Sequence, residues 1–317
     1  MKAFETFMDI VKQPEINSTT GLMGSERIPS SSPIPAGQLS VIILTFNEQV
    51  NLPACLDSLK GLNCAVFVLD SYSTDKTSEI AQDRGVSFHQ HVFENYALQR
   101  NWSQENLPIE TPWVLHLDAD ERLTPELVAE INSIMQNPPT AINGFLFRKR
   151  TIFMGKWIRH GGHYPSYHLR LFRTASGRCE DRLYDQHFMV DGPVEKLNND
   201  YLDIIASSLT SWTLRHAKWA QAEASEMLIT ERVGRQVNPD FMGTPIERKR
   251  WLRNGYGGAP LFIRAFLYGA YRYIFRLGFL DGKEGLIFHI LQGFWFRFLV
   301  DSLIYERKNF EETRSND

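Results

Sequence analysis

The sequence predicts an α/β domain with a mainly parallel central sheet, followed by a C-terminal amphipathic helical region. Two observations predict this. Over about 100 residues from Leu39, short apolar runs alternate with segments whose apolar residues recur at helical spacing. Beyond Ala259, aromatic and aliphatic residues recur at helical spacing instead.

The expected strands are short apolar runs at 39–46, 65–70, 86–91 and 113–118. The first is rich in β-branched residues, which is typical of a buried parallel strand. Helices are expected at 52–59, 73–84, 96–106, 124–135 and 212–233. Gly85 would end the second helix, and Thr124 would cap the fourth. Residues 144–194 predict short strands and loops, and residues 259–305 predict two helical segments broken near Gly278 and Gly285.

The composition excludes several classes of protein. The 317 residues carry 34 basic and 37 acidic side chains, a formal net charge of -3, which argues against a basic nucleic-acid binder. A hydrophobic content of 43% argues against whole-chain disorder. The three cysteines have no metal-site spacing, which favours a reducing compartment. We expect no secretory signal and no ordinary transmembrane helix, since no run of about 18 residues lacks charge.

Composition shifts divide the chain into four expected regions. A flexible leader rich in Pro, Ser and Gly is expected at 1–38, and the α/β domain at 39–235. A helical, basic and aromatic region is expected at 236–305, followed by a polar tail at 306–317.

Polar clusters follow three of the expected strands: residues 45–48, 70–75 and 118–121. Ligands of doubly wound sheets bind at the carboxyl ends of the strands, so the three clusters would meet in one crevice. Asp118-Ala-Asp120 has a particular use there, because carboxylates can hold a hard divalent cation and leave positions open for phosphate oxygens. The chain lacks a GxxxxGK[ST] loop, a GxGxxG after the first strand and a GxSxG elbow, which argues against the enzyme classes built on them.

Three runs together resemble the nucleotide-sugar domain of family 2 glycosyltransferases: 40–48 (SVIILTFNE), 69–77 (LDSYSTDKT) and 117–121 (LDADE). Further runs, such as 157–162 (WIRHGG) and 169–173 (LRLFR), resemble the branch of lipopolysaccharide-core β-glucosyltransferases and polysaccharide-assembly enzymes. The resemblance implies a GT-A fold, inversion at the anomeric carbon and a requirement for Mg²⁺ or Mn²⁺.

The resemblance also implies roles for single residues. The residues expected to bind the nucleotide sugar are Thr45, Asn47, Glu48, Asp70, Ser71, Ser73, Arg100 and Asp118. Among these, Asp70 would meet the uracil or ribose, Arg100 the diphosphate or sugar, and Asp118 the ribose or donor sugar. Asp120 would bind the metal, and His187 would be a third ligand or an acceptor contact.

An inverting transfer needs a carboxylate base beside the acceptor hydroxyl. The related branch often has His-Glu-His where this chain has Asp185-Gln186-His187, so Gln186 replaces the usual glutamate. Asp185 is therefore the first candidate for the catalytic base. The pair Glu180 and Asp181 comes second, and Glu195 third. The glycine-rich loop with His160, His163 and Tyr164 is a candidate acceptor site, and Arg170 and Arg173 would face the diphosphate.

The segment 248–276 holds seven basic residues and no acidic one: Arg248, Lys249, Arg250, Arg253, Arg264, Arg272 and Arg276. Arg264, Tyr268, Arg272 and Arg276 are four residues apart, which predicts one cationic stripe on an apolar helix. Such a helix suits a membrane interface with anionic lipid. The alternatives are an ordinary packed helical pair and an oligomer interface.

The sequence thus predicts an inverting glycosyltransferase, cytoplasmic and peripheral on the inner face of the cell membrane. It would move a sugar from a UDP-sugar to a lipid-linked glycan in bacterial cell-surface polysaccharide or lipopolysaccharide synthesis. No nucleic-acid partner is expected, and homo-oligomerisation stays open. Two alternatives also remain: a nucleotidyltransferase, and a non-catalytic scaffold on a degenerate transferase domain.

Overall fold

The structure is a computed structural model that describes residues 37–181, 186–233, 242, 256 and 258–310. The strands are β1 Leu39–Thr45, β2 Ala65–Asp70, β3 Ser87–Gln90, β4 Trp113–Asp118, β5 Glu121–Leu123, β6 Gly144–Phe153, β7 Lys156–Trp157, β8 Ser166–Arg173, β9 Gly177–Cys179, β10 Phe188–Val190 and β11 Val194–Ile205. The helices before the C-terminal region are α2 Leu52–Ser58, α3 Thr77–Asp83, α4 Tyr96–Asn106, α5 Pro125–Gln136 and α6 Leu209–Val233. The expected leader lies outside these described residues except for 37–38, and the expected tail lies outside them except for 306–310.

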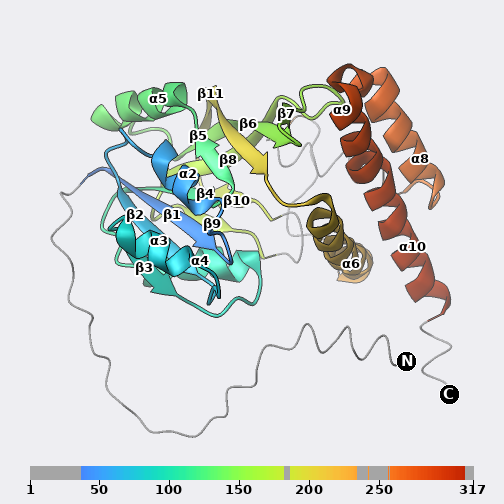
Figure 1. Cartoon of the computed structure of the whole chain (residues 1–317), viewed down its shortest axis with the longest axis horizontal. Helices are drawn as coiled ribbons and strands as arrows, with labels where there is room; N and C mark the ends of the chain where they lie inside the picture. Colours follow the sequence, from blue (N-terminus) through green and yellow to red (C-terminus); the bar gives the residue numbers. More distant parts are fainter. Residues whose placement is uncertain (1–36, 182–185, 234–241, 243–255, 257, 311–317) are drawn as a thin grey trace, which may run out of the picture. The chain divides into compact units, whose positions relative to one another are not determined.

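One sheet of nine strands organises the α/β domain (Figure 1). Its order is β3-β2-β1-β4-β8-β6-β11-β5, with β7 paired to β6. The pairs β3–β2, β2–β1, β1–β4 and β6–β11 are parallel, whereas β8 is antiparallel to both of its neighbours. The predicted α/β class, with a mainly parallel central sheet and a helical C-terminal region, is confirmed.

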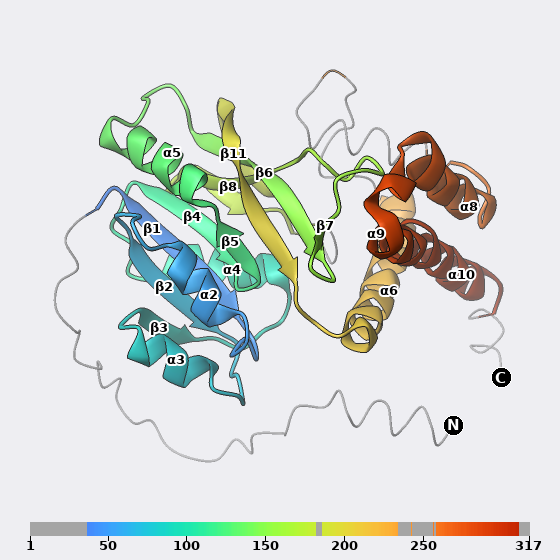
Figure 2. The same cartoon turned by 45° about the horizontal axis from the view of Figure 1, so that its top comes forward.

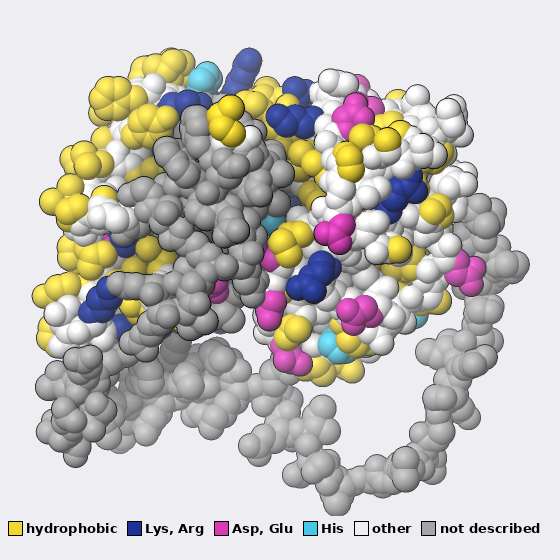
Figure 3. All heavy atoms as spheres, turned by 180° about the vertical axis from the view of Figure 1, so that it is seen from behind, with side chains coloured by type: hydrophobic (Ala, Val, Ile, Leu, Met, Phe, Trp, Pro, Cys, Tyr) yellow, Lys and Arg dark blue, Asp and Glu magenta, His cyan; other side chains and the backbone are white. Residues whose placement is uncertain are grey.

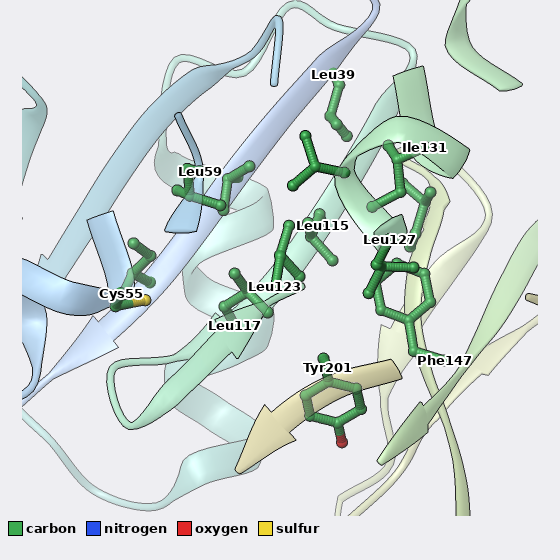
Figure 4. Close-up of a cluster of buried hydrophobic side chains, with 14 of the residues drawn as sticks. Leu39, Cys55, Leu59, Leu115, Leu117, Leu123, Leu127, Ile131, Phe147 and Tyr201 are labelled. Carbon is green, nitrogen blue, oxygen red and sulfur yellow. The ribbon is translucent and has the colours of Figure 1, made fainter. Parts of the chain in front are cut away.

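Helices cover both faces of the sheet (Figure 2). The apolar sides of α2, α3 and α5 pack on one face, where residues such as Leu56, Leu127 and Ile131 meet β1 and β4. Figure 4 shows this cluster, with Tyr201 of β11 at its lower edge. The other face is covered by α4 and the β9–β10 hairpin. Each fully buried aliphatic or aromatic side chain contributes about 1.5–3 kcal/mol relative to exposure, so these two layers hold the strand ends in place.

Local chemistry explains where the expected helices begin. Thr124 caps α5 as predicted, because its side chain accepts a hydrogen bond from the backbone N of Leu127 at 3.3 Å. The helix α3 begins at Thr77 rather than at residue 73. The carboxylate of Asp75 accepts from the backbone N of Gln49 at 3.1 Å and from that of Thr77 at 3.0 Å, which ties this segment to the loop after β1.

The C-terminal region is a helical hairpin. Its first arm is α8 Ile263–Ala270 and the π-helical turn η1 Tyr271–Phe275. Its second arm is η2 Gly278–Asp281, α9 Gly282–Phe288, the π-helical segment η3 His289–Trp295 and α10 Phe296–Asn309. The predicted break near Gly278 is confirmed, and the residue before it, Leu277, has a left-handed φ of 59°.

The predicted break near Gly285 is wrong, because Gly285 lies inside α9. A Cβ at Gly285 would lie 2.3 Å from the Cβ of Asp281, so the glycine permits close packing rather than ending a helix. The second arm, Gly278–Asn309, is long and apolar enough to cross a membrane by length and composition alone. The sequence-based expectation of no transmembrane helix considered only runs without any charged residue, whereas this arm contains charged residues. The core helix of a soluble protein meets the same criteria, and 39% of the apolar window is buried here.

Two arginines of the predicted cationic stripe point inward. Arg264 is 4% exposed and Arg272 is 7% exposed. Arg264 pairs with Asp301 of α10 at 2.5 Å, and Arg272 donates to the backbone O of Gly161 at 2.9 Å. The stripe is therefore wrong as a description of the outer surface at these two positions, since both guanidinium groups hold the hairpin together or fix it to the sheet domain. Arg248–Arg253 lie outside the described residues.

Candidate functional site

The three polar clusters meet at one edge of the sheet, as the sequence predicts. In the parallel register, Thr45 at the end of β1 lies opposite Asp70 at the end of β2. On its other side, Leu44 lies opposite Asp118 at the end of β4. The edge is formed by neighbouring strands, so the clusters are adjacent because of the strand order.

Asp70 organises the loops of this edge. Its Oδ1 accepts from the hydroxyl of Thr45 at 2.9 Å and from that of Ser73 at 2.5 Å. Its Oδ2 accepts from the backbone N of Ser73 at 2.8 Å and from the amide of Gln90 at 3.2 Å. The side chain is 0% exposed, so its oxygens face four protein donors. The predicted contact with uracil or ribose stays a prediction, and Ser71 is held nearby by the amide of Gln99 at 3.2 Å.

The loop after β1 is locked to the loop after β2. Asn47 has a left-handed φ of 56°, its backbone N donates to the hydroxyl of Ser73 at 2.8 Å, and its Oδ1 accepts from the backbone N of Thr74 at 2.8 Å. The backbone N of Glu48 donates to Thr77 at 2.8 Å. The side chain of Glu48 is partly buried, and burial raises its pKa.

Two exposed aromatic side chains flank this pair of loops. Phe46 is 55% exposed and Tyr72 is 53% exposed. Such rings offer flat apolar faces beside the polar strand ends. The sequence motifs do not single out either residue, although Phe46 lies in the run 40–48 and Tyr72 in the run 69–77.

Asp118 forms ion pairs with two arginines. Arg100 of α4 donates to its Oδ1 at 3.0 Å and its Oδ2 at 3.3 Å, and Arg170 of β8 donates to its Oδ2 at 3.2 Å. Burial alone would raise the pKa of Asp118, but the two guanidinium groups hold it well below its usual range. Arg170 also pairs with Glu121, whose pKa rises to about 7 because it is buried. Arg100 and Arg170 thus contact the Asp-x-Asp motif, and their predicted contacts with the diphosphate or sugar stay predictions.

Asp120 has the opposite environment. Burial and the carboxylates of Asp203, Asp118, Glu121 and Glu48 raise its pKa well above the usual range. Across the described parts of the chain, no lysine, arginine or histidine forms an ion pair with it. Its backbone O accepts from the backbone N of Ile204 at 2.9 Å, which fixes the motif to β11.

Asp203 is a residue of this cluster that sequence reasoning missed. It lies on β11 opposite Glu121 of β5, and it pairs with Lys149 of β6 at 2.9 Å. Burial alone would lower the pKa of Lys149, yet the charge of Asp203 holds it above its usual value. No short motif marks Asp203 in the sequence. It reaches Asp120 only through the pairing of β11 with β5 and β6, which lie far from it along the chain.

The predicted base residues have distinct surroundings. Glu180 is 1% exposed, and its Oε1 accepts from the backbone N of His187 at 3.1 Å and lies 3.1 Å from the Nδ1 of His187. Asp181 is exposed. Asp185 lies outside the described residues. Glu195 is exposed on β11, where it pairs in register with Phe145 of β6.

The predicted acceptor loop contacts the C-terminal hairpin. His160 donates from its backbone N to Asp281 at 2.9 Å, and His163 lies 3.3 Å from a guanidinium nitrogen of Arg272. Tyr164 instead donates to Asp200 at 3.1 Å. Arg173 donates to the backbone O of Pro139 at 2.8 Å, so it faces the loop before β6 rather than the Asp-x-Asp motif.

The arrangement fits a cation held jointly with a ligand. In the residues described, no three His, Cys, Asp or Glu side chains are grouped to hold a metal by themselves. Mg²⁺ commonly binds through one or two carboxylates plus phosphate oxygens and water. Asp120 is surrounded by carboxylates and has no cationic partner in the described regions, so it fits such a cation.

Comparison with known proteins agrees with this geometry. Residues 40–190 match the family model described as Glycosyl transferase family 2. A lipopolysaccharide core biosynthesis glycosyltransferase, LpsC of Rhizobium meliloti (strain 1021), is 31% identical over 160 residues, which is 46% of this chain and 55% of that protein. An uncharacterized glycosyltransferase of Rickettsia bellii (strain RML369-C) is 34% identical over 97 residues, 31% of this chain and 32% of that one. The chain thus matches about a third to about half of the length of these relatives.

Two solved structures are similar at low sequence identity. Mannosyltransferase PcManGT from Pyrobaculum calidifontis, in complex with GDP-Man and Mn²⁺, is 13% identical with a TM-score of 0.46, over 87% of this chain and 88% of that one. S. aureus TarS 1-349 is 14% identical with a TM-score of 0.39, over 86% and 91%. The family-model match runs from β1 to β10, and it includes the polar strand ends and Asp118-Ala-Asp120. Over residues 40–190, just under half of its length, the chain is thus similar to glycosyl transferase family 2.

Proposed function

We propose that this protein is a metal-dependent, inverting glycosyltransferase that uses a UDP-sugar. The observation that carries the proposal is the contrast between two aspartates two residues apart. Asp118 is neutralised by Arg100 and Arg170, whereas Asp120 stands among carboxylates with no cationic partner in the described residues. A partly buried carboxylate among other carboxylates is costly to ionise unless a cation joins it.

Asp120 would hold the Mg²⁺ or Mn²⁺, and His187 is the further candidate ligand from the sequence. The bound metal would offset the charge of the departing diphosphate. Arg100 and Arg170 already orient Asp118, so this carboxylate can accept hydrogen bonds from ribose or donor-sugar hydroxyls without moving. Thr45, Asn47, Glu48, Ser71 and Ser73 would line the nucleoside side of the same edge.

A carboxylate base on the acceptor side would remove the proton of the attacking hydroxyl. The oxygen would then attack the anomeric carbon in line with the departing diphosphate, which inverts the configuration. Asp185 remains our first candidate for this base. Asp181 is exposed and free of burial cost, whereas Glu180 is buried against His187, so Asp181 is the better second candidate.

The acceptor we propose is a lipid-linked glycan at the inner face of the cell membrane, as in lipopolysaccharide or other surface-polysaccharide synthesis. The name of the relative LpsC supports this class of acceptor. The C-terminal hairpin supports it as well, because its outer face carries exposed apolar side chains. Its first arm and the turn expose Ile263, Phe266, Leu267, Tyr271, Ile274, Phe275, Leu277, Phe279 and Leu280, which we call the apolar face.

Figure 3 shows hydrophobic side chains gathered over the C-terminal helices, at the left of that view. Exposed side chains at 263, 266–267, 271 and 274–275 follow the helical repeat, so they form one stripe. Contiguous exposed apolar surface of this kind marks a membrane or protein contact. We propose the membrane, with the face entering the lipid interface.

The test is calorimetry of UDP binding with and without Mn²⁺, using the wild type and Asp120→Asn. The wild type should bind UDP in a metal-dependent manner, and D120N should lose that dependence while unfolding at the same or a higher temperature, since one like-charged neighbour is removed. Turnover of the correct UDP-sugar should fall at least about 100-fold in D120N. The matched control is Asp191→Asn, which neutralises an exposed carboxylate in the turn after β10.

A screen of UDP-sugars, read by metal-dependent UDP release, identifies the donor. Full activity of D120N with metal present would refute the metal assignment. Absence of metal-dependent UDP binding by the wild type would instead favour the scaffold alternative. Release of pyrophosphate from a nucleoside triphosphate would favour the nucleotidyltransferase.

A further inference from the structure

The loop 160–163 joins the sheet domain to the C-terminal hairpin. The backbone N of Gly161 donates to the backbone O of Arg276 at 2.8 Å, and Arg272 donates from Nε to the backbone O of Gly161 at 2.9 Å. Asp281 accepts from both the backbone N and the Nδ1 of His160, at 2.9 and 2.6 Å. The loop is therefore fastened on both sides by residues of the hairpin.

The fit is too close for a side chain at the centre of the loop. Gly161 has a left-handed φ of 68°, and a Cβ there would lie 2.1 Å from the ring of His289. Only glycine combines this backbone conformation with such a close approach. The hairpin and the loop therefore form one packed unit.

Arg272 is unusual within this unit. It is 7% exposed, and no carboxylate forms an ion pair with it in the part of the chain that the structure describes. Its hydrogen bonds go to the backbone O of Gly161 and to the Nδ1 of His163, at 3.3 Å. Burying a guanidinium without a counter-charge is costly, so the hydrogen bonds to these two acceptors must offset part of that cost.

Hydrogen-bond chemistry fixes the proton of His163. A guanidinium only donates, so the Nδ1 of His163 must accept from Arg272. The Nε2 lies 2.9 Å from the hydroxyl of Thr151, and that hydroxyl gives its single proton to Oδ2 of Asp203 at 3.3 Å. Thr151 must then accept from His163, which requires the proton on Nε2. The hydrogen bonds at Nδ1 and at Nε2 therefore require the same neutral tautomer of His163.

This series of hydrogen bonds ends at Asp203, which lies near the carboxylate of Asp120, the proposed metal ligand. Asp203 is held by Thr151 and by Lys149, which pairs with the same oxygen at 2.9 Å. The next residue on β11, Ile204, donates from its backbone N to the backbone O of Asp120 at 2.9 Å. Asp203 is thus fixed at one oxygen, and it lies on β11, whose next residue is hydrogen-bonded to the backbone of Asp120.

We propose that Asp203 is a positioning residue of the nucleotide-sugar site, and that Arg272, His163 and Thr151 set its orientation from the C-terminal hairpin. The inference rests on the proposed function, because it concerns the same metal-dependent site. Hydrogen-bonded partners behind a metal site orient the groups in front of them, and their loss commonly costs 10- to 100-fold in metal affinity or activity. The hairpin that carries the apolar face thereby also orients a residue of the nucleotide-sugar site.

The experiment compares Thr151→Val, Thr151→Ser and wild type by calorimetry with Mn²⁺ and UDP. Thr151→Val removes the hydroxyl and keeps the shape, so the apparent affinity for Mn²⁺ in the presence of UDP should fall about tenfold. Thr151→Ser restores the hydroxyl and should recover most of that loss. Ser87→Ala is the matched control, because Ser87 makes the same kind of hydrogen bond, to His89 at 2.9 Å, on β3.

Two measurements keep the inference testable if Thr151→Val does not fold. Arg272→Lys keeps the charge but cannot reach both acceptors with one planar group, so it should produce a loss in the same direction. Nitrogen-15 NMR of the wild-type histidines should show the His163 proton on Nε2 near neutral pH. A proton on Nδ1, or a Thr151→Val affinity equal to that of Ser87→Ala, overturns the inference while the proposed function stands. Failure of the wild type to bind UDP with Mn²⁺ overturns both.

Discussion

At the scale of single residues, chemistry at the strand ends depends on partners rather than on residue type. Asp70, Asp118 and Asp120 are all carboxylates at the edge of the sheet. Asp70 is fully buried under four donors, Asp118 is held by two arginines, and Asp120 has carboxylate neighbours. One residue type therefore provides a loop organiser, an oriented acceptor of hydrogen bonds and a candidate metal ligand.

Asp185→Asn tests the proposed base. Replacing a general base with an amide of the same shape should lower kcat by about 100-fold or more, because the acceptor hydroxyl keeps its proton. The Kd for UDP with Mn²⁺ should change less than twofold, since the donor side is untouched. Turnover assays and calorimetry on the same protein preparation check both values.

Asp181→Asn is the companion variant for that experiment. Near-normal turnover of Asp185→Asn together with a large loss in Asp181→Asn would move the base to Asp181. Glu180→Gln is informative in another way, because its buried pairing with His187 predicts a lower melting temperature.

At the scale of elements, the hairpin arms are joined by a buried ion pair. Asp301 of α10 is 0% exposed and accepts from Arg264 at 2.8 and 2.5 Å. It also accepts from the backbone N of Phe262 at 2.8 Å, at the start of α8. The pair therefore fixes both the position and the first turn of α8.

Asp301→Ala should destabilise the protein by about 3–5 kcal/mol, because it removes the buried carboxylate to which Arg264 donates two hydrogen bonds. The double variant Arg264→Met/Asp301→Leu should recover a large part of that loss by replacing the pair with apolar contacts. Urea unfolding, followed by circular dichroism, measures both. Equal stability of the two variants would show that the charge is not the cause.

The packing of α6 against the hairpin predicts acid sensitivity. His216 of α6 is 5% exposed, and burial lowers its pKa to about 4. The unfolded chain takes up its proton near pH 6.5, whereas the folded chain resists until about pH 4. Stability is therefore full above about pH 6.5 and declines as the pH falls, by at most about 2 kcal/mol for this residue at pH 5.

Urea midpoints of wild type and His216→Gln, measured at pH 7.5 and pH 5, check this pH dependence. His216→Gln should show a smaller decline between the two pH values, although it should be less stable at pH 7.5 because Gln cannot reproduce the stacking on Trp212 at 3.5 Å. A decline as large as that of the wild type would assign the acid sensitivity to other buried histidines, such as His116.

At the scale of the whole molecule, the hairpin presents an apolar face outward and a loop contact inward. Phe266 is 65% exposed and Phe275 is 75% exposed on the same stripe. Phe266→Glu/Phe275→Glu should lower binding to vesicles with anionic lipid at least about tenfold, because two large apolar side chains no longer enter the interface and two negative charges are added. Vesicle co-sedimentation measures this change.

Val50→Glu is the control, since Val50 is 73% exposed on the loop after β1. It should leave vesicle binding unchanged. If the double variant pellets as well as the wild type but changes from a dimer to a monomer by light scattering, the apolar face is a subunit interface and the membrane proposal fails.

Much of the domain follows from local sequence. The bounds of β2, α4 and β4 agree with their predicted ranges, because each is a short apolar run or a capped helix with clear ends. The strand β5 was missed, since three residues carry no periodic signal. Arg264 and Arg272 were placed on the outside because charge and spacing do not reveal which side of a helix meets a partner.

By itself, the sequence determined the α/β class, the family-like runs and the convergence of three polar strand ends, because period and residue type express these features over short distances. The tertiary structure decided that Asp118 is neutralised by two arginines and that Asp120 is surrounded by other carboxylates. It also decided that Asp203 joins Asp120 and that an arginine of the C-terminal hairpin reaches the same site through His163 and Thr151. These contacts join β6, β11, a glycine-rich loop and a helix, and only the folded backbone brings such distant positions within hydrogen-bond distance.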